Sequence, residues 1–142
     1  LSEDKGPPPE INLFNEKNIG ETVLKLIDKN LINSCHDVSL GGILVAISKM
    51  CLMGQKGVKL NPIKTLINKF EYFFAEDQGR YIVELEKKNV ENVTKILKEN
   101  SVHYDELGTV SKNLVEFKSE IKLTIEEIEE SNKTWLKKYM DN

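Results

Sequence analysis

The amino-acid sequence predicts an α+β fold in which a mixed β-sheet is flanked by helices. Helical and strand-like segments alternate as far as residue 100, and short strand-like segments then cluster between residues 104 and 123. Such a mixture, without a regular strand–helix repeat, is typical of α+β domains. With 142 residues, the chain is long enough to bury a single hydrophobic core.

The first half of the chain is expected to fold as helix, strand and buried helix. Apolar residues recur close to the 3.6 period in residues 16–32, which predicts an amphipathic helix. Residues 34–38 follow as a short strand. They lead into a helix at 40–53, with Ser39 as its N-cap and Gly54 as its C-terminal cap. The apolar stripe expected to be buried in the first helix comprises Ile19, Val23, Leu24, Leu26, Ile27 and Leu31.

The second half is expected to begin with a helix and to end with strands. A helix is predicted from Asn61 to about Lys69, because proline at position 62 gives up no hydrogen bond in a first turn. Alternation predicts a strand at residues 80–85, and periodicity predicts a helix up to Asn100. Further strands are predicted at residues 104–110, 114–117 and 121–123, followed by a helix through Trp135 that Thr124 and Glu127 begin as a capping box.

Composition narrows the classes of function. The chain carries 20 Lys and Arg residues against 23 Asp and Glu residues, a net charge of −3, and these charges are interspersed. A nucleic-acid-binding protein would carry a basic patch, and a membrane span would need about 18 consecutive apolar residues. We therefore expect neither nucleic acid nor a membrane as a partner.

The start of the chain and its cysteines indicate its context. Residues 1–12 are predicted to be an interdomain linker, since the prolines at positions 7–9 suit neither a helix nor a central strand. We therefore expect the chain to be part of a longer protein. Cys35 and Cys51 lack zinc-site spacing and no secretory signal precedes them, so reduced thiols in the cytoplasm are expected.

The first segment that could carry chemistry covers residues 35–42, where a polar strand end meets a helix start with two glycines. Gly41 and Gly42 would let a phosphate approach the helix N-terminus, or they would let the helix pack closely on a neighbour. The adjacent His36 and Asp37 are expected to point to opposite faces of the strand and not to pair. For His36, a hydrogen-bonded structural role is favoured over a general base.

The second segment covers residues 73–81 and contains two carboxylates, an amide and an arginine. A ribose or a metal-bound phosphate could be bound by Glu76, Asp77 and Gln78. The guanidinium of Arg80 could then donate two hydrogen bonds to the phosphate. The alternative is a surface turn in which Arg80 pairs with Glu76 or Asp77. The sequence contains no Walker-type loop, dinucleotide fingerprint, zinc spacing or nucleophile elbow, so we assign no catalytic residue and no metal ligand.

The order of these segments resembles the last domain of the phosphoribosylformylglycinamidine synthase family. Three positions depart from the family pattern, namely Leu40, Ala75 and the pair Ser111-Lys112. The segments that carry the resemblance are residues 6–12, His36-Asp37-Val38-Ser39-Leu40-Gly41-Gly42, Phe74-Ala75-Glu76-Asp77-Gln78-Gly79-Arg80-Tyr81, Leu107-Gly108-Thr109-Val110 and Trp135-Leu136-Lys137-Lys138-Tyr139-Met140.

This resemblance implies that residues 13–142 form the second C-type domain of a synthetase related to aminoimidazole ribonucleotide synthetase. The implied enzyme is an ATP-dependent carbon–nitrogen ligase of purine biosynthesis. It converts formylglycinamide ribonucleotide and ammonia to the amidine, with ATP and Mg²⁺ bound mainly by N-type domains, so the isolated domain should be inactive. The implied nucleotide- or substrate-pocket candidates are His36, Asp37, Ser39, Gly41, Gly42, Glu76, Asp77, Gln78 and Arg80.

The resemblance also implies partners. These are the N-type domains of the parent chain, a separate glutaminase subunit that supplies ammonia, and a small bridging subunit. Two alternatives remain open from the sequence: a nucleotide-binding regulatory module, or the C-terminal domain of a related enzyme such as aminoimidazole ribonucleotide synthetase.

Overall fold

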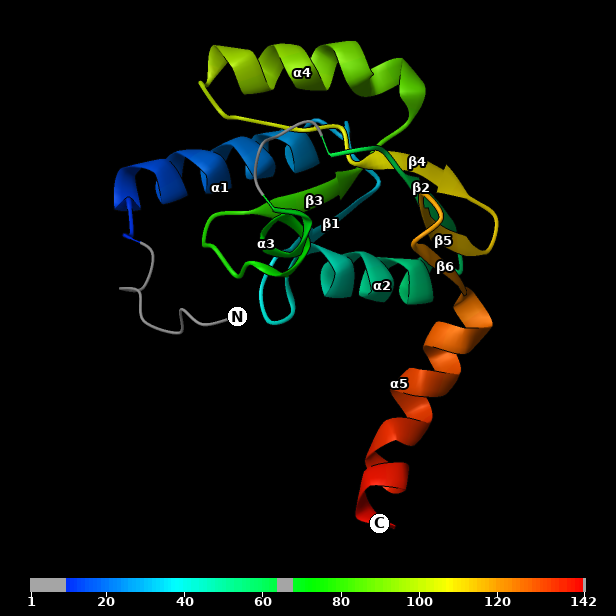
Figure 1. Cartoon of the computed structure of the whole chain (residues 1–142). Helices are drawn as coiled ribbons and strands as arrows, with labels where there is room; N and C mark the ends of the chain where they lie inside the picture. The colour runs from blue at the N-terminus through cyan, green and yellow to red at the C-terminus, as the bar shows by residue number, and fades with distance from the viewer. Residues whose placement is uncertain (1–9, 64–67, 142) are drawn as a thin grey trace. The chain divides into compact units, whose positions relative to one another are not determined.

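The computed structural model describes residues 10–63 and 68–141, and these residues form two compact units (Figure 1). The first unit comprises residues 10–40 and 76–104, and the second comprises residues 41–63, 68–75 and 105–141. Helices and a sheet with both parallel and antiparallel neighbours are present, so the predicted α+β class with a mixed sheet is confirmed. None of the helices within the described residues is long and apolar enough to cross a membrane.

The first unit pairs two short strands antiparallel and packs two helices together. Strand β1 runs beside β3, with Ser34 opposite Glu84 and Asp37 opposite Tyr81. Helix α1 packs against α4. The elements of this unit are α1 (Leu13–Asp28), β1 (Ser34–Asp37), β3 (Tyr81–Glu84), the 3-10 turn η1 (Lys87–Asn89) and α4 (Val90–Glu99).

The core of the first unit lies between α1 and α4. Leu26 of α1 is buried with Val93 and Ile96 of α4, and four half-buried apolar residues surround this cluster. Thr22 is buried as well, and its hydroxyl donates to the Asn18 carbonyl at 2.8 Å, so its polar group is satisfied. The surrounding residues are Leu31, Ile32, Leu85 and Leu97.

The second unit contains the mixed sheet, in the strand order β4-β2-β5-β6. Strand β2 is parallel to β5 and antiparallel to β4, and β5 is antiparallel to β6. The elements are α2 (Gly42–Gly54), β2 (Gly57–Leu60), α3 (Lys69–Phe74), β4 (Gly108–Ser111), β5 (Leu114–Phe117), β6 (Ile121–Thr124) and α5 (Ile125–Met140).

An aromatic contact joins a helix to the sheet in the core of the second unit. The rings of Phe73 in α3 and Phe117 in β5 meet edge to face, with centroids 4.9 Å apart. Such a pair contributes about 0.5–1.5 kcal/mol beyond the burial of its area. Helix α2 packs against both α3 and α5. The other buried apolar residues of this unit are Ile43, Ala46, Ile47, Cys51, Leu60, Val115 and Ile125.

The ends of α2 differ from the prediction. The helix begins at Gly42 with Gly41 as its N-cap, not Ser39, because a turn at residues 40–41, in which Gly41 has positive φ, precedes the first helical residue. At the other end Gly54 is still helical. Gln55 takes the left-handed conformation instead, and its backbone N–H donates to the Cys51 carbonyl.

The segment after α2 also differs. The structure shows strand β2 at Gly57–Leu60, which the sequence did not predict, because this strand is specified by its partners β4 and β5. Pro62 is not helical, and residues 64–67 of the helix predicted from Asn61 lie outside the described residues. Helix α3 begins only at Lys69, where Asn68 caps it.

For α1, β4 and α5, the predicted type is correct but the predicted start or end differs from the observed one. Helix α1 begins earlier than predicted, since the Asn12 side chain accepts from the Asn15 N–H, and it ends at Asp28. Leu24 and Ile27 are exposed, contrary to the predicted stripe. Strand β4 is shorter than predicted, whereas α5 continues to Met140. Residues 1–9 of the predicted linker lie outside the described residues.

Candidate functional site

The β1–β3 pair brings together those parts of the two predicted segments that belong to the first unit. His36 lies opposite Ile82 in the ladder, and Asp37 lies opposite Tyr81. Beyond the last ladder pair, the Val38 N–H donates to the Arg80 carbonyl at 2.8 Å. Residues 36–38 and residues 80–82 are therefore neighbours, although about forty positions separate them in the sequence.

The expectation that His36 and Asp37 do not pair is wrong. Nδ1 of His36 lies 2.5 Å from the Asp37 carbonyl oxygen and 3.3 Å from its carboxylate oxygen Oδ1. Strand alternation separates side-chain directions only within the ladder, and Asp37 is its last residue. Because a carbonyl can only accept, the shorter contact is a hydrogen bond in the ring form that carries a hydrogen on Nδ1.

The loop before β3 forms the local ion pair that one of the two alternatives predicted. Nη1 of Arg80 lies 3.5 Å from Oδ2 of Asp77. The Asp77 side chain is 52% exposed and that of Arg80 27% exposed, so the pair contributes about 0–1 kcal/mol. Glu76 and Gln78 are exposed beside it.

Gly79 lets this loop close on the first turn of α1. Its φ is +68°, a conformation that favours glycine, and a Cβ there would lie 3.0 Å from Oε1 of Glu16. Glu16 therefore borders the loop that contains Asp77 and Arg80. The sequence did not single out Glu16, and no local pattern could have done so, because its place depends on how α1 packs.

In the second unit, Gly42 supports the close-packing alternative for the glycine pair. Its φ is +68°, and a Cβ there would lie 2.4 Å from the Phe73 carbonyl oxygen and 2.7 Å from Cα of Phe74. Backbone of α3 thus fills the space on that side of Gly42. Gly41 is half-buried with φ +85°, and Ser39, in the first unit, is exposed.

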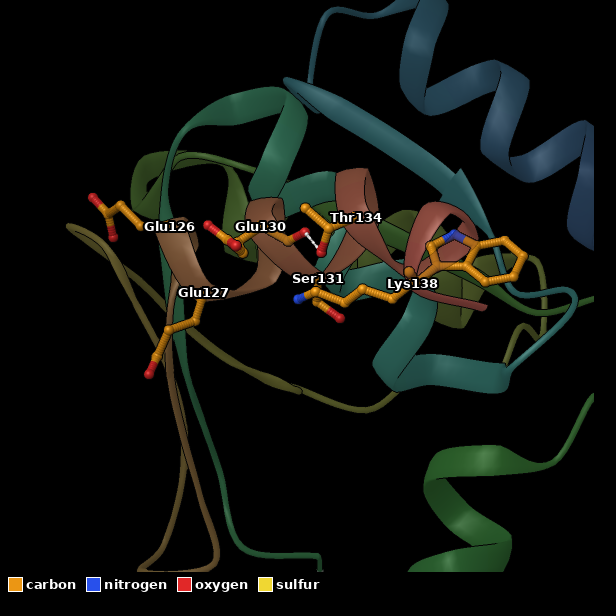
Figure 2. Close-up of a pocket in the computed structure, with 7 residues that line it drawn as sticks. Glu126, Glu127, Glu130, Ser131, Thr134 and Lys138 are labelled. Atoms are coloured by element: carbon orange, nitrogen blue, oxygen red, sulfur yellow. Dashed lines mark hydrogen bonds between the residues drawn. The ribbon is translucent and has the colours of Figure 1, made fainter. Parts of the chain in front are cut away.

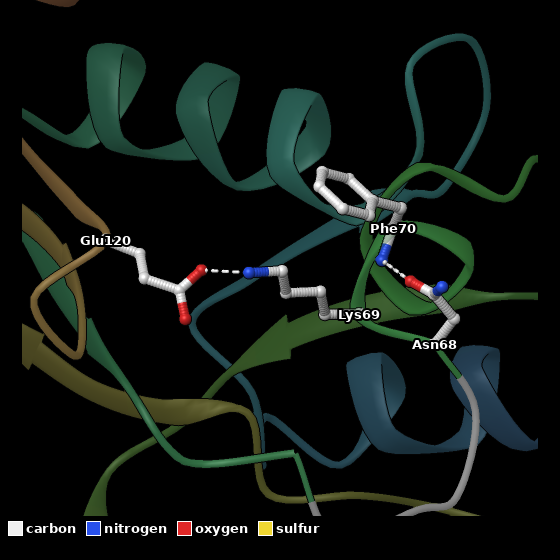
Figure 3. A network of polar contacts seen from close by, with 4 residues as sticks. All are labelled: Asn68, Lys69, Phe70 and Glu120. Atoms are coloured by element: carbon white, nitrogen blue, oxygen red, sulfur yellow. Dashed lines mark hydrogen bonds and ion pairs between the residues drawn. The ribbon is translucent and has the colours of Figure 1, made fainter. Parts of the chain in front are cut away.

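An ion pair ties α3, which packs on Gly42, to the turn between β5 and β6 (Figure 3). Nζ of Lys69 lies 2.5 Å from Oε2 of Glu120. Beside it, Oδ1 of Asn68 accepts from the Phe70 N–H at 2.9 Å and caps the helix. The hydrogen bond from Lys69 lowers the pKa of the Glu120 carboxyl.

The thiols show no sign of activation. Although Cys35 is an exposed residue, desolvation of its sulfur by neighbouring atoms and, to a lesser degree, the nearby Asp37 carboxylate raise the pKa of its thiol. Burial alone raises the pKa of Cys51. Since the thiolate is the nucleophile and the metal ligand, neither cysteine is prepared for catalysis. Among residues 10–63 and 68–141, no three His, Cys, Asp or Glu side chains gather as a metal site would require.

A depression on the surface of α5 contains none of the predicted site residues (Figure 2). The residues that line it all come from this one helix, so no second element provides an opposing wall. Within it, the Thr134 hydroxyl donates to the Glu130 carbonyl at 2.8 Å. The lining residues are Glu126, Glu127, Glu130, Ser131, Thr134, Trp135 and Lys138.

The fold and its segments define a family. Residues 1–117 match the family described as "AIR synthase related protein, C-terminal domain", and the chain belongs to this family. Its relatives narrow the class further. It is 58% identical, over all 142 residues, to the phosphoribosylformylglycinamidine synthase subunit PurL of Pelagibacter ubique. It is 39% identical over 131 residues, 89% of its length, to PurL of Caldanaerobacter subterraneus. The resemblance drawn from the motifs is confirmed.

The chain spans about a fifth of the length of these relatives, 20% of the first and 18% of the second. Solved structures share its fold. Thermotoga maritima PurL complexed with FGAR superposes with a TM-score of 0.72 at 19% identity, over 83% of this chain and 21% of that one. The structure of PurLQS from the same organism gives 0.73 at 18% identity, over 84% of this chain and 22% of that one.

Proposed function

We propose that residues 13–142 are the second C-type domain of a phosphoribosylformylglycinamidine synthase. The full-length enzyme would convert formylglycinamide ribonucleotide, ATP and ammonia to formylglycinamidine ribonucleotide, ADP and phosphate. The observation that carries this proposal is the 58% identity to a PurL subunit over every residue of the chain. That identity is far higher than the 18–19% at which the solved structures share only the fold.

Within that enzyme, the end of the β1–β3 ladder in this domain would form part of the wall of a nucleotide or ribonucleotide pocket. His36 and Asp37 lie at this end, and Arg80 is joined to it through Val38. A phosphate oxygen could replace the Asp77 carboxylate on the Arg80 guanidinium, since both are anionic acceptors that fit its planar fork. Asp37 could accept from a ribose hydroxyl. Ser39, Gly41 and Gly42 follow directly in the sequence, and Glu76 and Gln78 flank Asp77.

The reaction itself would take place on other domains. The family resemblance assigns ATP and Mg²⁺ mainly to the N-type domains, and T. maritima PurL has been solved with ATP and with ADP. When bound, Mg²⁺ would neutralise charge on the phosphoryl group being transferred. This chain's part would be to bind and orient the non-reacting portion of a ligand, so the domain alone would be inactive.

The proposal includes partners and a compartment. A separate glutaminase subunit would supply ammonia, and a small bridging subunit would join the two, as the existence of a PurLQS structure supports. Two reduced cysteines, the exposed Cys35 and the buried Cys51, fit the cytoplasm.

Phosphate release tests the reaction. The full-length protein is mixed with Mg-ATP, formylglycinamide ribonucleotide and a high concentration of ammonium salt, which replaces the glutaminase. Release that requires both substrates is expected. A folded full-length protein that releases no phosphate would refute the assignment and would direct attention to aminoimidazole ribonucleotide synthetase chemistry. Nucleotide binding without turnover of either substrate would favour a regulatory module.

A pair of variants tests the site. Arg80→Ala in the full-length enzyme should raise KM for ATP or for the ribonucleotide at least about tenfold, which corresponds to about 1.4 kcal/mol. The matched control is Lys87→Ala, which removes an exposed cation from the same unit away from the ladder end. Unchanged KM for both substrates in Arg80→Ala would remove this loop from the site and leave the reaction assignment standing.

A further inference from the structure

Helix α5 carries along its whole length a stripe that is apolar at every position except Asn132. Positions 125, 128, 132, 135 and 139 are spaced alternately three and four residues apart, and positions 136 and 140 lie beside this row on the same side of the helix. Helix α2 packs against α5, Ile125 is 3% exposed and Ile128 is half-buried. The stripe consists of Ile125, Ile128, Asn132, Trp135, Leu136, Tyr139 and Met140.

The second half of the same stripe has no cover within the second unit. Trp135 and Leu136 are 58% and 55% exposed, and Tyr139 and Met140 are 74% and 72% exposed. From residue 131 to residue 140, every residue except the half-buried Thr134 is exposed. In Figure 1, the first turns of α5 lie near α2 and the rest of the helix runs on beyond it.

The opposite face of this half is polar and charged. Its residues include Lys137 and also Ser131, Thr134 and Lys138, which line the open depression shown in Figure 2; Trp135, at the border of the stripe, lines that depression as well. Lys133, at the edge of the stripe, pairs with Glu129 one turn earlier on the same helix. The charges therefore belong to a solvated face, whereas the stripe between residues 131 and 140 contains no charged residue.

Such a helix end requires a partner. Most helical stability in proteins comes from packing of the amphipathic face rather than from intrinsic propensity. Contiguous exposed patches of large apolar side chains mark interaction surfaces. Two aromatic residues beside a leucine and a methionine are also the residue types enriched at the centres of such surfaces.

We propose that the stripe of α5 from Asn132 to Met140 docks into an apolar groove formed by another domain of the same full-length polypeptide. The alignment with the 58% identical relative includes α5, and about four-fifths of that relative lies outside the aligned region. The family match ends at residue 117, before α5 begins. A PurL relative thus aligns with the chain through the end of α5, and the rest of that relative's length could provide a covering surface in the same polypeptide.

Because the stripe carries no charge, we expect the surface that covers it to be apolar. A strongly acidic or basic groove would gain nothing from Trp135, Leu136 or Tyr139 and would lose its own hydration on contact. An apolar groove buries all three. This inference depends on the length of the relatives and on the geometry of α5, and it is independent of the reaction that the enzyme catalyses.

Cysteine accessibility in the full-length protein tests the proposal. Asn132→Cys and Tyr139→Cys place a thiol in the stripe, and Lys137→Cys places one on the opposite face as the matched control. The modification rate by a small maleimide is measured for each position by peptide mass spectrometry and divided by its rate in denaturant. We expect both stripe positions to react at least about tenfold more slowly than the control.

Each outcome decides the proposal. Equal rates at the three positions would overturn it. If Tyr139→Cys fails to fold, the reaction rate of Asn132→Cys still tests the proposal, because this substitution removes no apolar side chain and should leave the fold intact. Protection that disappears on dilution would indicate a second copy, and protection that requires added glutaminase subunit would indicate another protein; either result overturns the proposal. Phosphate release is measured separately, so protection without release would refute the proposed function and support the docking.

Discussion

Replacing Gly42 with alanine is the sharpest test of how α2 is built. The added Cβ would lie 2.4 Å from the Phe73 carbonyl oxygen and 2.8 Å from the carbonyl carbon of Phe74. Both atoms belong to the backbone of α3, so no side-chain rotation can make room. The Lys69–Glu120 ion pair further fixes this helix to the β5–β6 turn.

The magnitude follows from two separate costs. A non-glycine residue in the left-handed region, where Gly42 has φ +68°, costs about 1–2 kcal/mol. Forcing an extra methyl into a packed interior costs about 1–3 kcal/mol. The sum is about 2–5 kcal/mol, a large part of the roughly 5–15 kcal/mol that stabilises a typical domain.

Urea unfolding of the 142-residue chain, followed by circular dichroism, measures this loss. With a slope of about 2 kcal/mol per molar urea, the midpoint should fall by about 1–2.5 M. Gly20→Ala is the matched control, because Gly20 lies inside α1 and a Cβ there meets nothing within 4 Å. The same chemical change should raise the free energy of unfolding by about 0.5–1 kcal/mol at that position.

A Gly42→Ala chain as stable as the parent would refute the packing argument. If, in addition, the full-length variant lost nucleotide affinity while its stability was unchanged, Gly42 would serve the approach of a phosphate to the helix N-terminus. Loss of stability in Gly42→Ala together with gain in Gly20→Ala would confirm that α3, not a ligand, requires the glycine.

Three further predictions concern caps and ionisable groups. Thr124→Ala should lower the free energy of unfolding by about 0.5–2 kcal/mol because the capping box of α5 is lost, whereas Thr124→Ser should retain most of it in the same urea assay. Because the hydrogen bond from Lys69 lowers the pKa of Glu120 in the folded state, that pair stabilises the fold above the unfolded-state pKa and stops doing so as pH falls through the lower folded-state pKa. Glu120→Gln should therefore be less stable than the parent near neutral pH, and the difference should vanish in acid; a difference independent of pH would contradict this. Asp37→Asn should lower the pKa of Cys35, read from the pH dependence of its alkylation rate, while desolvation keeps that pKa above its ordinary value.

The sequence predicted those elements whose signals are local. Strand β5 at Leu114–Phe117 and the Thr124 capping box were found because alternation and cap residues act over a few positions. Strand β2 was missed, since Gly57–Leu60 becomes a strand through hydrogen bonds to β4 and β5, far along the chain. The helix predicted from Asn61 to about Lys69, with Pro62 in its first turn, is also wrong at its start, because α3 begins at Lys69 with Asn68 as its cap.

In the candidate site, too, local features were predicted from the sequence, whereas features that depend on distant segments were not. The sequence named the two segments and offered the Asp77–Arg80 pair as one reading. It could not give the register that joins Val38 to Arg80, and it wrongly separated His36 from Asp37. Both depend on where the β1–β3 ladder ends.

By itself, the sequence determined the α+β class and the family, because periodicity, caps and the order of motifs are written in consecutive residues. The tertiary structure decided what Gly42 is for, where Glu16 lies and which half of the α5 stripe is covered. Each of these depends on contact between segments that are distant in the chain. Such contacts arise from packing, in which one backbone fills the space that another residue leaves, and no local pattern encodes that space.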